Sequence, residues 1–276
     1  MDHYCVMGNP VEHSKSPWIH ARFAQLTGQD LAYGKRLIPL DGFGAALRAF
    51  RAEGGKGCNI TVPFKFQAAP FATTLTDRAR LAHACNTLRF DGAHEVFADN
   101  TDGLGLVDDI QRNAGVALAG RDLLLIGAGG AAAGVLGPLI EAKPRRIVVT
   151  NRTAGKAQEL VARHAALARD CGVALAQQPL DAVQEPFDVV VNATASSLSG
   201  SGIPVADSVL KPGTLAVDMM YGPAADGFMA WAREHGAVPR DGLGMLVEQA
   251  AEAFLVFRGV RPPSAQVLAE LRATLG

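Results

Sequence analysis

The chain has 276 residues, which suits two domains or one large one. Hydrophobic residues make up 49% of it and charged residues 19%, a globular balance that argues against disorder. The formal net charge of −1 gives no general attraction to nucleic acid or to an anionic membrane, so any anionic ligand must be held by local groups.

Targeting and metal signals are missing from the sequence. No apolar run approaches the roughly 20 residues needed to cross a bilayer, and the N-terminus lacks the basic segment and apolar core of a secretion signal. Cys5, Cys58, Cys85 and Cys171 form no CxxC pair, so we expect them to be reduced and buried. The histidines show no HExxH or comparable spacing, and no metal site is predicted. We expect a cytoplasmic protein.

The first hundred residues alternate short β-branched runs with helical patterns. Residues 4–7 predict a strand, and Pro17 suits the first turn of the helix that follows. Residues 57–62 predict the next clear strand, which Pro63 should end because proline cannot donate to a sheet ladder. This alternation is typical of an α/β domain.

A second series of strands and helices follows a predicted bridging helix over residues 104–113. Four continuous apolar runs are predicted as buried parallel strands: residues 123–126, 147–150, 187–191 and 214–217. Helical patterns such as residues 156–168 lie between them, and repeated strand–helix units predict a doubly wound parallel sheet. From about residue 245 the chain reads as helical to its end.

A dinucleotide-binding pattern stands at the start of this second series. The strand at residues 123–126 runs into a GxGxxA motif that opens an alanine-rich helix. Gly127 permits a tight turn, Gly129 lets the backbone approach a pyrophosphate, and Ala132 keeps the helix close to the sheet. Because strand, turn and helix occur in the right order, the motif indicates a dinucleotide site and not an ordinary glycine-rich turn.

The end of the next predicted strand indicates which dinucleotide is bound. NAD-selective sites usually carry Asp or Glu roughly 20 residues past the glycines, where it bonds the ribose 2′-hydroxyl. This chain instead has Asn151, Arg152 and Thr153, with Lys156 one helical turn later. The two cations could be plain surface charges, but cations are unfavourable at the start of a helix. A 2′-phosphate explains them better, so NADP is predicted.

Polar clusters outside the nucleotide-binding part sit where predicted elements end. They are Ser14 to Ser16, Asn59 to Lys65, Asn86 with Thr87, and Asn100 to Gly103. Taken singly, each could be a helix cap or a turn. Together they predict a concave polar site at the carboxyl ends of strands. Lys65 and Asp102 are the complementary charged pair among them, suited to acid–base work or to steadying a developing oxyanion.

The chain resembles the shikimate dehydrogenase family over essentially its whole length. The motifs that carry the resemblance, in family order, are "GNPVEHSKSPWIH", "GCNITVPFK", "ACNTL", "DNTDG", "LLLIGAGGAAAG", "VTNRT", "NATA", "DMMYGP" and "DGLGMLVEQAAEAF". The resemblance implies reduction of 3-dehydroshikimate to shikimate with NADPH, in the pathway to chorismate and aromatic amino acids. It implies a substrate domain over residues 1–103, completed by helices within 241–276, and a Rossmann-like NADP domain over 104–240.

The resemblance also assigns residues to roles. Lys65 and Asp102 match the family's catalytic pair, and Ser14 and Ser16 match the residues that hold the substrate carboxylate. Positions that match those around the ring hydroxyls are Thr61, Lys65, Asn86, Asp102, Tyr221 and Gln249. Positions that match cofactor contacts are Asp77, Gly127, Ala128, Gly129, Gly130, Ala131, Asn151, Arg152, Thr153, Lys156, Ala193, Thr194, Met219 and Gly242.

Some features leave alternatives open. The glycine loop continues with alanines where many members have a small residue and then arginine, so one phosphate contact of the family is absent. The alternatives are a paralogue acting on quinate or another shikimate-like acid, with NAD as a further choice of cofactor, and a non-catalytic protein that senses NADP. Retention of Lys65 and Asp102 speaks against the latter. The resemblance leaves monomer and homodimer open.

Overall fold

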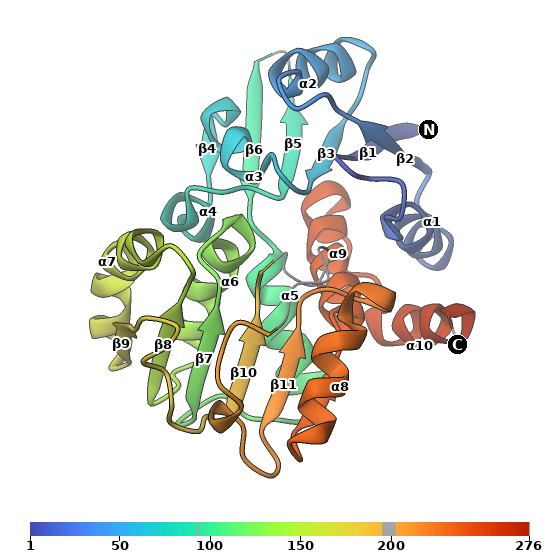
Figure 1. The fold of residues 1–276 in the computed structure, drawn as a ribbon. Coiled ribbons are helices and arrows are strands. Elements are labelled where there is room, and N and C mark those ends of the chain that lie inside the picture. Colours follow the sequence, from blue (N-terminus) through green and yellow to red (C-terminus); the bar gives the residue numbers. More distant parts are fainter. Residues whose placement is uncertain (93, 195–202, 276) are drawn as a thin grey trace. The chain divides into compact units, whose positions relative to one another are not determined.

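The computed structural model describes residues 1–92, 94–194 and 203–275. The chain divides into two compact units. Unit 1 comprises Met1–Gly105 and the chain from Leu246 onward, and unit 2 comprises Leu106–Met245. Each unit contains its own sheet with flanking helices (Figure 1). No helix in the described ranges is long and apolar enough to cross a membrane.

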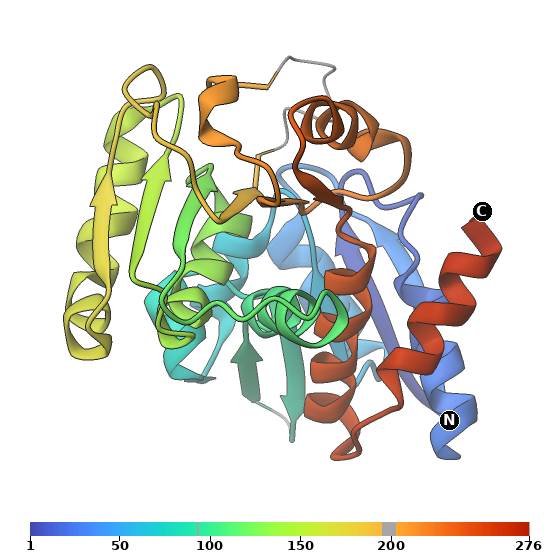
Figure 2. The ribbon, with the colours of Figure 1, turned by 90° about the horizontal axis from the view of Figure 1, so that it is seen from below.

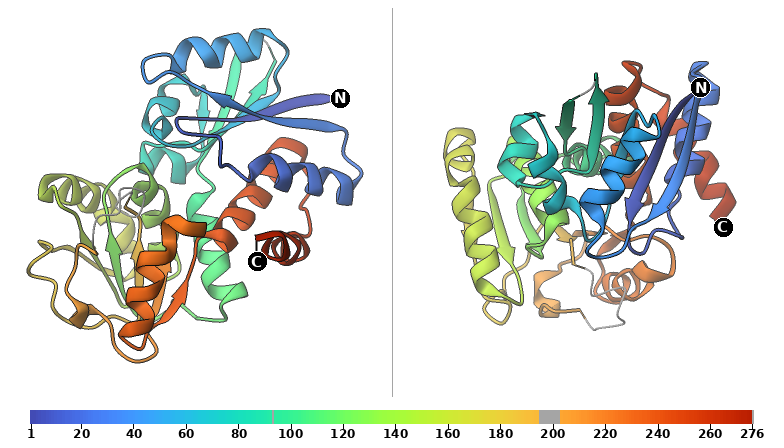
Figure 3. Two further views of the ribbon diagram at one scale, coloured as in Figure 1. Left: turned by 45° about the vertical axis from the view of Figure 1, so that its right-hand side comes forward. Right: turned by 90° about the horizontal axis from the view of Figure 1, so that it is seen from above.

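Unit 1 is built on a mixed six-stranded sheet in the order β2-β1-β3-β5-β6-β4. Its strands are β1 (Asp2–Gly8), β2 (Leu31–Leu37), β3 (Gly57–Ile60), β4 (Thr74–Leu75), β5 (Thr87–Asp91) and β6 (Glu95–Asp99). β3 is parallel to β1 and antiparallel to β5, and β5 is antiparallel to β6 (Figure 3). Consequently β1, β3 and β6 all end at the same edge of the sheet, where β5 begins.

Helices cover this sheet and join its two sequence segments. They are α1 (Ser16–Thr27), α2 (Phe43–Ala52), α3 (Lys65–Ala68), α4 (Asp77–Ala82) and α10 (Ser264–Leu275). As predicted, Pro17 lies in the first turn of α1. α1 packs beside α10 (Figure 2), and Arg22 Nε donates to Glu270 Oε2 across them at 2.6 Å. The C-terminal helix is therefore an integral part of the N-terminal unit.

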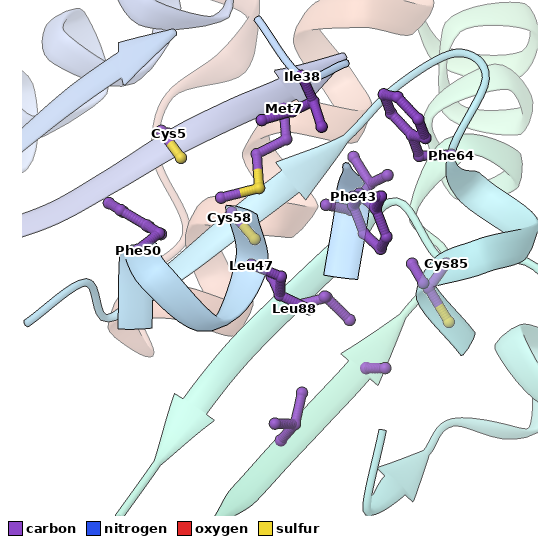
Figure 4. Packing of buried hydrophobic residues seen from close by; sticks show 14 of the residues in the cluster. Cys5, Met7, Ile38, Phe43, Leu47, Phe50, Cys58, Phe64, Cys85 and Leu88 are labelled. Atoms are coloured by element: carbon purple, nitrogen blue, oxygen red, sulfur yellow. The ribbon is translucent and has the colours of Figure 1, made fainter. Parts of the chain in front are cut away.

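The main core of unit 1 lies between α2 and the sheet. Phe43, Leu47 and Phe50 form the buried stripe of α2, at the spacing expected for one face of a helix. They pack with Met7 of β1, Cys58 of β3 and further apolar side chains (Figure 4). Close packing on this face fixes the strands whose ends carry the polar clusters.

The strand predicted over residues 57–62 is shorter than expected. β3 ends at Ile60, because Thr61 begins a turn in which its carbonyl accepts from Phe64 N at 3.0 Å. Pro63 thus lies inside the turn and does not end the strand. Lys65 is the first residue of the short helix α3. The alternative that Asn86 and Thr87 form a turn is wrong for Thr87, which begins β5.

Unit 2 contains the doubly wound parallel sheet that was predicted. All neighbouring strands are parallel, in the order β12-β11-β10-β7-β8-β9. The strands are β7 (Asp122–Ile126), β8 (Arg146–Thr150), β9 (Ala174–Gln177), β10 (Val189–Asn192), β11 (Leu215–Asp218) and β12 (Val238–Arg240). The order reverses between β7 and β10, which is where such sheets bind ligands. The helices within unit 2 are α6 (Gly130–Glu141), α7 (Ala154–Cys171) and α8 (Asp226–Glu234), the last lying against β11 and β12.

Two helices carry the chain from one unit to the other: α5 (Asp102–Asp108) and α9 (Leu243–Arg258). α5 continues into a π-helical segment, Asp109–Asn113, which matches the helix predicted over residues 104–113. In unit 2, Asp109 is completely buried and accepts two hydrogen bonds from Arg240, at 2.6 and 2.5 Å. The Asp109 carboxylate also lies against Gly244, where an added Cβ would be 1.8 Å from Asp109 Oδ1, so only glycine fits there.

We expect Asp109→Ala to destabilise unit 2, because it leaves the Arg240 guanidinium largely buried without its carboxylate. The free energy of unfolding should fall by about 3–5 kcal/mol, measured by chemical denaturation. Arg112→Ala is the control, since Arg112 pairs with Asp108 at 3.1 Å on the same helical segment but is more than half exposed. It should change stability by less than about 0.5 kcal/mol. Equal effects of the two substitutions would contradict a special role for the buried pair.

The imidazole of His20 lies inside unit 1 among aromatic rings. It is 1% exposed and stacks on Tyr33 with ring centroids 4.1 Å apart. Burial lowers the pKa of His20 from 6.5 to about 3. Between pH 6.5 and about pH 3, His20 therefore binds a proton in the unfolded chain but not in the folded chain. The free energy of unfolding is unaffected by His20 above pH 6.5 and falls as the pH drops from 6.5 toward 3.

Replacing His20 should flatten this pH dependence. Between pH 7 and pH 5 the histidine accounts for a loss of about 2 kcal/mol in the free energy of unfolding. The His20→Phe variant keeps an aromatic ring in the site and removes the titrating group, so its loss over the same interval should be smaller by that amount. Urea unfolding at the two pH values measures it. An unchanged pH dependence in the variant would refute the assignment.

Candidate active site

Lys65 and Asp102 meet at one edge of the unit 1 sheet. Lys65 follows the end of β3 and Asp102 follows the end of β6, two strands that end at the same edge. Lys65 Nζ donates to Asp102 Oδ2 at 2.5 Å. The two side chains are only 14% and 7% exposed. Lys65 is thus held on the Asp102 carboxylate in a largely buried position.

Asn86 holds the other side of the carboxylate. It stands just before β5, at the same edge, and its Nδ2 donates to Asp102 Oδ1 at 2.9 Å. The Asn86 Oδ1 accepts from Thr101 N at 2.9 Å, which fixes the orientation of the amide because a backbone N–H can only donate. Both oxygens of Asp102 therefore accept hydrogen bonds, as an ionised carboxylate does.

Gln249 of α9 joins this cluster from the C-terminal segment of unit 1. Its Oε1 lies 3.3 Å from Asn86 Nδ2, and its backbone carbonyl accepts from Thr101 Oγ1 at 3.0 Å. Four predicted site residues from four separate motifs of the sequence are thereby brought together: Lys65, Asn86, Asp102 and Gln249. Such a cluster can orient a polar ligand and deliver a proton to it.

The other predicted substrate residues of unit 1 lie in turns that follow β1 and β3. Ser14 is partly exposed, and its Oγ accepts from Ser16 N at 3.3 Å as α1 begins. Lys15 is the N-cap residue and no side chain caps α1, so Ser14 shapes the turn that precedes the helix. Thr61 is partly exposed directly after β3. An added Cβ on Gly8 would meet Thr61 Cγ2 at 2.2 Å, so this turn requires a residue without a side chain at Gly8.

Sequence reasoning missed the residues that support the cluster from behind. Asn59 Nδ2 donates to the Asn86 carbonyl and to Thr87 Oγ1, each at 3.0 Å. Asp99 accepts from Arg78 Nε at 2.8 Å and from Thr76 Oγ1 at 2.7 Å, at the end of β6. The signal for Asn59 and Thr87 was present, since both stand in the polar clusters. Nothing in the sequence pattern indicated their partners.

In unit 2 the glycine loop has the geometry of an anion site. Gly127 has φ +118°, and an added Cβ would lie 3.1 Å from the Ala193 carbonyl, so a side chain is excluded there. Gly129, the residue before α6, has open space where a Cβ would be, and no side chain caps the helix. The backbone around Ala128, Gly130 and Ala131 can therefore face a ligand. Helix amides left without side-chain partners suit a pyrophosphate.

The segment after β8 offers positive charge at the start of a helix. Asn151 Nδ2 donates to the Thr153 carbonyl at 2.9 Å and shapes the turn. Arg152, Thr153 and Lys156 are exposed, and the first turn of α7 carries no acidic residue. The arrangement leaves both cations accessible to an anionic group, which fits the phosphate of NADP.

Further predicted cofactor residues follow β10 and β11. Ala193 and Thr194 follow Asn192, whose Oδ1 accepts from Thr194 N at 3.2 Å. Gly242 N donates to the Met220 carbonyl at 2.8 Å, and an added Cβ would lie 2.3 Å from Met219 O, so only glycine fits. Met219 and Tyr221 are both partly exposed beside this turn. The last residue of the NATA motif, Ala195, lies outside the described residues.

The side chain of Asp77 contacts neither the Lys65–Asp102 cluster nor the predicted cofactor residues of unit 2 in the hydrogen bonds and ion pairs described. It begins α4 in unit 1, its side chain is 98% exposed, and its Oδ1 accepts from Arg80 Nη1 at 2.6 Å. Over the described ranges, no group of three or more His, Cys, Asp or Glu side chains could hold a metal ion. All four cysteines are free.

Three family models match successive parts of the chain. They are the shikimate dehydrogenase substrate binding domain at residues 6–88, shikimate / quinate 5-dehydrogenase at 109–200, and the shikimate 5′-dehydrogenase C-terminal domain at 242–272. A curated relative from Paracidovorax citrulli, named shikimate dehydrogenase (NADP(+)), is 68% identical over 99% of this chain and 98% of its own length. A relative of the same name from Herminiimonas arsenicoxydans is 55% identical over 99% of this chain and 98% of its own length.

Solved structures agree in fold over the whole chain. The Ael1 enzyme from Pseudomonas putida is 44% identical, with a TM-score of 0.89 and 98% of each chain covered. A shikimate 5-dehydrogenase from Thermus thermophilus, solved in complex with shikimate, is 30% identical, with a TM-score of 0.85 and 100% of each chain covered. The similarity therefore extends through both units and both connecting helices.

Proposed function

Because the chain belongs to the shikimate dehydrogenase family, we propose that it catalyses the reversible, NADPH-dependent reduction of 3-dehydroshikimate to shikimate. The observation that carries this proposal is the largely buried Lys65–Asp102 pair, 2.5 Å apart at the edge of the substrate-domain sheet. The proposal extends to the wider role that the family implies, a step toward chorismate and aromatic amino acids.

The pair has the chemistry that ketone reduction requires. When bound, NADPH would supply the hydride for the carbonyl carbon. A proton must reach the carbonyl oxygen, and Lys65 Nζ is the donor in its bond to Asp102. Asp102 accepts from both sides and keeps the ammonium oriented. We therefore propose that Lys65 transfers the proton and that Asp102 orients the Lys65 ammonium. In shikimate oxidation the proton would return from the substrate hydroxyl to Lys65.

The remaining residues of the site would bind the substrate. Ser14 and Ser16, at the start of α1, would hold the carboxylate with hydroxyl and amide donors. The ring hydroxyls would be bound by Thr61, Asn86, Tyr221 and Gln249. The overall charge of −1 supports capture of the anion by these local donors and by Lys65, not by a general positive field.

Unit 2 would hold the cofactor. Gly127 to Ala131 present backbone at the start of α6 for the pyrophosphate, and Asn151 to Thr153 with Lys156 present donors and charge for the 2′-phosphate. Ala193, Thr194, Met219 and Gly242 would line the nicotinamide end, and Asp77 would add an outer contact. We assign residues 1–103 with 241–276 to the substrate domain and 104–240 to the NADP domain.

The cellular setting follows from the same assignment. Four free cysteines support a reducing compartment, and we place the enzyme in the cytoplasm. Either a monomer or a homodimer is compatible with the proposal, because each proposed substrate and cofactor residue is supplied by one chain.

Lys65→Ala should lower kcat for shikimate oxidation by about 100-fold or more, since proton transfer loses its donor. The binding of shikimate, measured by calorimetry, should weaken far less. Lys56→Ala is the control and should keep full activity. Lys56 is exposed and directly precedes the first residue of β3. The assay pairs shikimate and quinate with NADP+ and NAD+. Equal or better rates with quinate and NAD+ would overturn the proposed function, and an active Lys65→Ala enzyme would overturn the proposed mechanism.

Arg152→Ala should raise the KM for NADP+ roughly tenfold and leave that for NAD+ nearly unchanged, because a charge-assisted bond to the 2′-phosphate is lost. Arg169→Ala is the matched control, since Arg169 lies in the last turn of α7, at the opposite end from Arg152, which precedes the helix, and is 78% exposed. Steady-state kinetics with both cofactors measure the ratio. A similar rise with NAD+ would show that Arg152 does not contact the 2′-phosphate.

A further inference from the structure

A chain of hydrogen bonds leads from the Asp102 carboxylate across the unit 1 sheet to the partly buried Tyr33. Asn86 Nδ2 donates to Asp102 Oδ1 at 2.9 Å, and Asn86 Oδ1 accepts from Thr87 Oγ1 at 2.8 Å. Thr87 Oγ1 accepts in turn from Asn59 Nδ2 at 3.0 Å. Asn59 Oδ1 accepts from the Tyr33 hydroxyl at 2.7 Å. Tyr33 stands at the far end, on β2, and reaches the carboxylate through Asn59, Thr87 and Asn86.

Each bond in this chain has one possible direction. Thr101 N must donate to Asn86 Oδ1, so the amide nitrogen of Asn86 faces Asp102. The backbone carbonyl of Asn86 must accept, so the amide nitrogen of Asn59 faces it, at 3.0 Å. The oxygen of Asn59 therefore faces Tyr33, whose hydroxyl must be the donor. Removing that hydroxyl leaves a buried amide oxygen without the donor that holds it.

The surroundings of Tyr33 suit a fixed donor. Its ring stacks on His20 with centroids 4.1 Å apart and planes 5° from parallel. His20 is itself buried. Burial raises the pKa of the Tyr33 phenol well above its usual range, so the hydroxyl keeps its proton at any pH where the enzyme would work. The position of the hydroxyl is thus set by packing, and its state does not vary.

We propose that Tyr33 is a positioning residue for the reaction: its hydroxyl braces Asn59, and through Thr87 and Asn86 it fixes the orientation in which Asp102 meets Lys65. The inference rests on the proposed function, since it gives Tyr33 a role through the proposed catalytic pair. Tyr33 reaches the carboxylate only through these intermediates. Its effect should appear in turnover, because the rate of proton transfer depends on the orientation of the donor.

The test is Tyr33→Phe, which keeps the ring and its stacking on His20 and removes one hydroxyl. We expect kcat for shikimate oxidation to fall about three- to tenfold, the effect of one buried hydrogen bond, with a smaller change in KM. Tyr4→Phe is the matched control. Tyr4 pairs with Tyr33 in register on the neighbouring strand β1, but its hydroxyl contacts the Phe257 carbonyl at 3.5 Å and Arg258. Its kcat should stay unchanged.

A double-mutant cycle with Asn59→Ala separates positioning from general stability. If Tyr33 acts through Asn59, Tyr33→Phe should have little further effect on kcat once Asn59 is gone. A loss caused by general destabilisation would be additive, and it would appear in Tyr4→Phe as well if both variants lower the melting temperature equally.

The outcomes are distinct. Non-additive loss of kcat in Tyr33→Phe, with Tyr4→Phe intact, supports the inference. Equal kcat in Tyr33→Phe and the unmodified enzyme, or additive losses with Asn59→Ala, overturns it while the proposed function stands. Absence of shikimate oxidation in the unmodified enzyme overturns the proposed function and the inference with it. Full activity of Lys65→Ala overturns the proposed mechanism, and the inference falls with that mechanism.

Discussion

The side chain of Asn86 is the contact on which the proposed active site depends. One amide bridges the end of β6, through Thr101 N, and the carboxylate of Asp102. The same amide receives Thr87 Oγ1 and lies within 3.3 Å of Gln249 Oε1, so the N-terminal and C-terminal segments of unit 1 meet on it. Because the backbone N–H of Thr101 can only donate, the amide has one orientation, and its nitrogen faces Asp102 Oδ1.

Sheet topology explains why such distant residues converge. β3 and β6 are both antiparallel to β5, so their carboxyl ends meet the beginning of β5. The residues at these three ends are Lys65, Asp102 and Asn86, which makes the edge polar while the α2 face of the sheet stays apolar. In unit 2 the constraint is different. There the backbone of one turn packs directly against the backbone of another. A side chain at Gly127 or at Gly242 would collide with a neighbouring carbonyl group.

Much of the fold was predictable because its signals are local. The parallel strands of unit 2 are continuous apolar runs, and the glycines of the turn before α6 have a fixed spacing. Strand ends were less predictable: β3 stops at Ile60, since the bond from Phe64 N to Thr61 O forms a turn that β-branched residues alone would not indicate. The contribution of Tyr33 was beyond sequence reasoning. A single tyrosine on a strand carries no mark of its partner, and 26 positions separate it from Asn59.

The choice of cation separates the proposed catalytic carboxylate from structural ones. Asp99, Asp109 and Asp122 are also buried, and each accepts two hydrogen bonds from an arginine. A guanidinium holds its proton at any physiological pH and binds a carboxylate as a planar fork, which suits a permanent brace. Asp102 is instead paired with lysine, whose single ammonium can rotate and can give up a proton. Arginine at position 65 would preserve the ion pair and lose the proton donor. The residue type at this one position therefore turns a structural motif that occurs elsewhere in the molecule into one that can do chemistry.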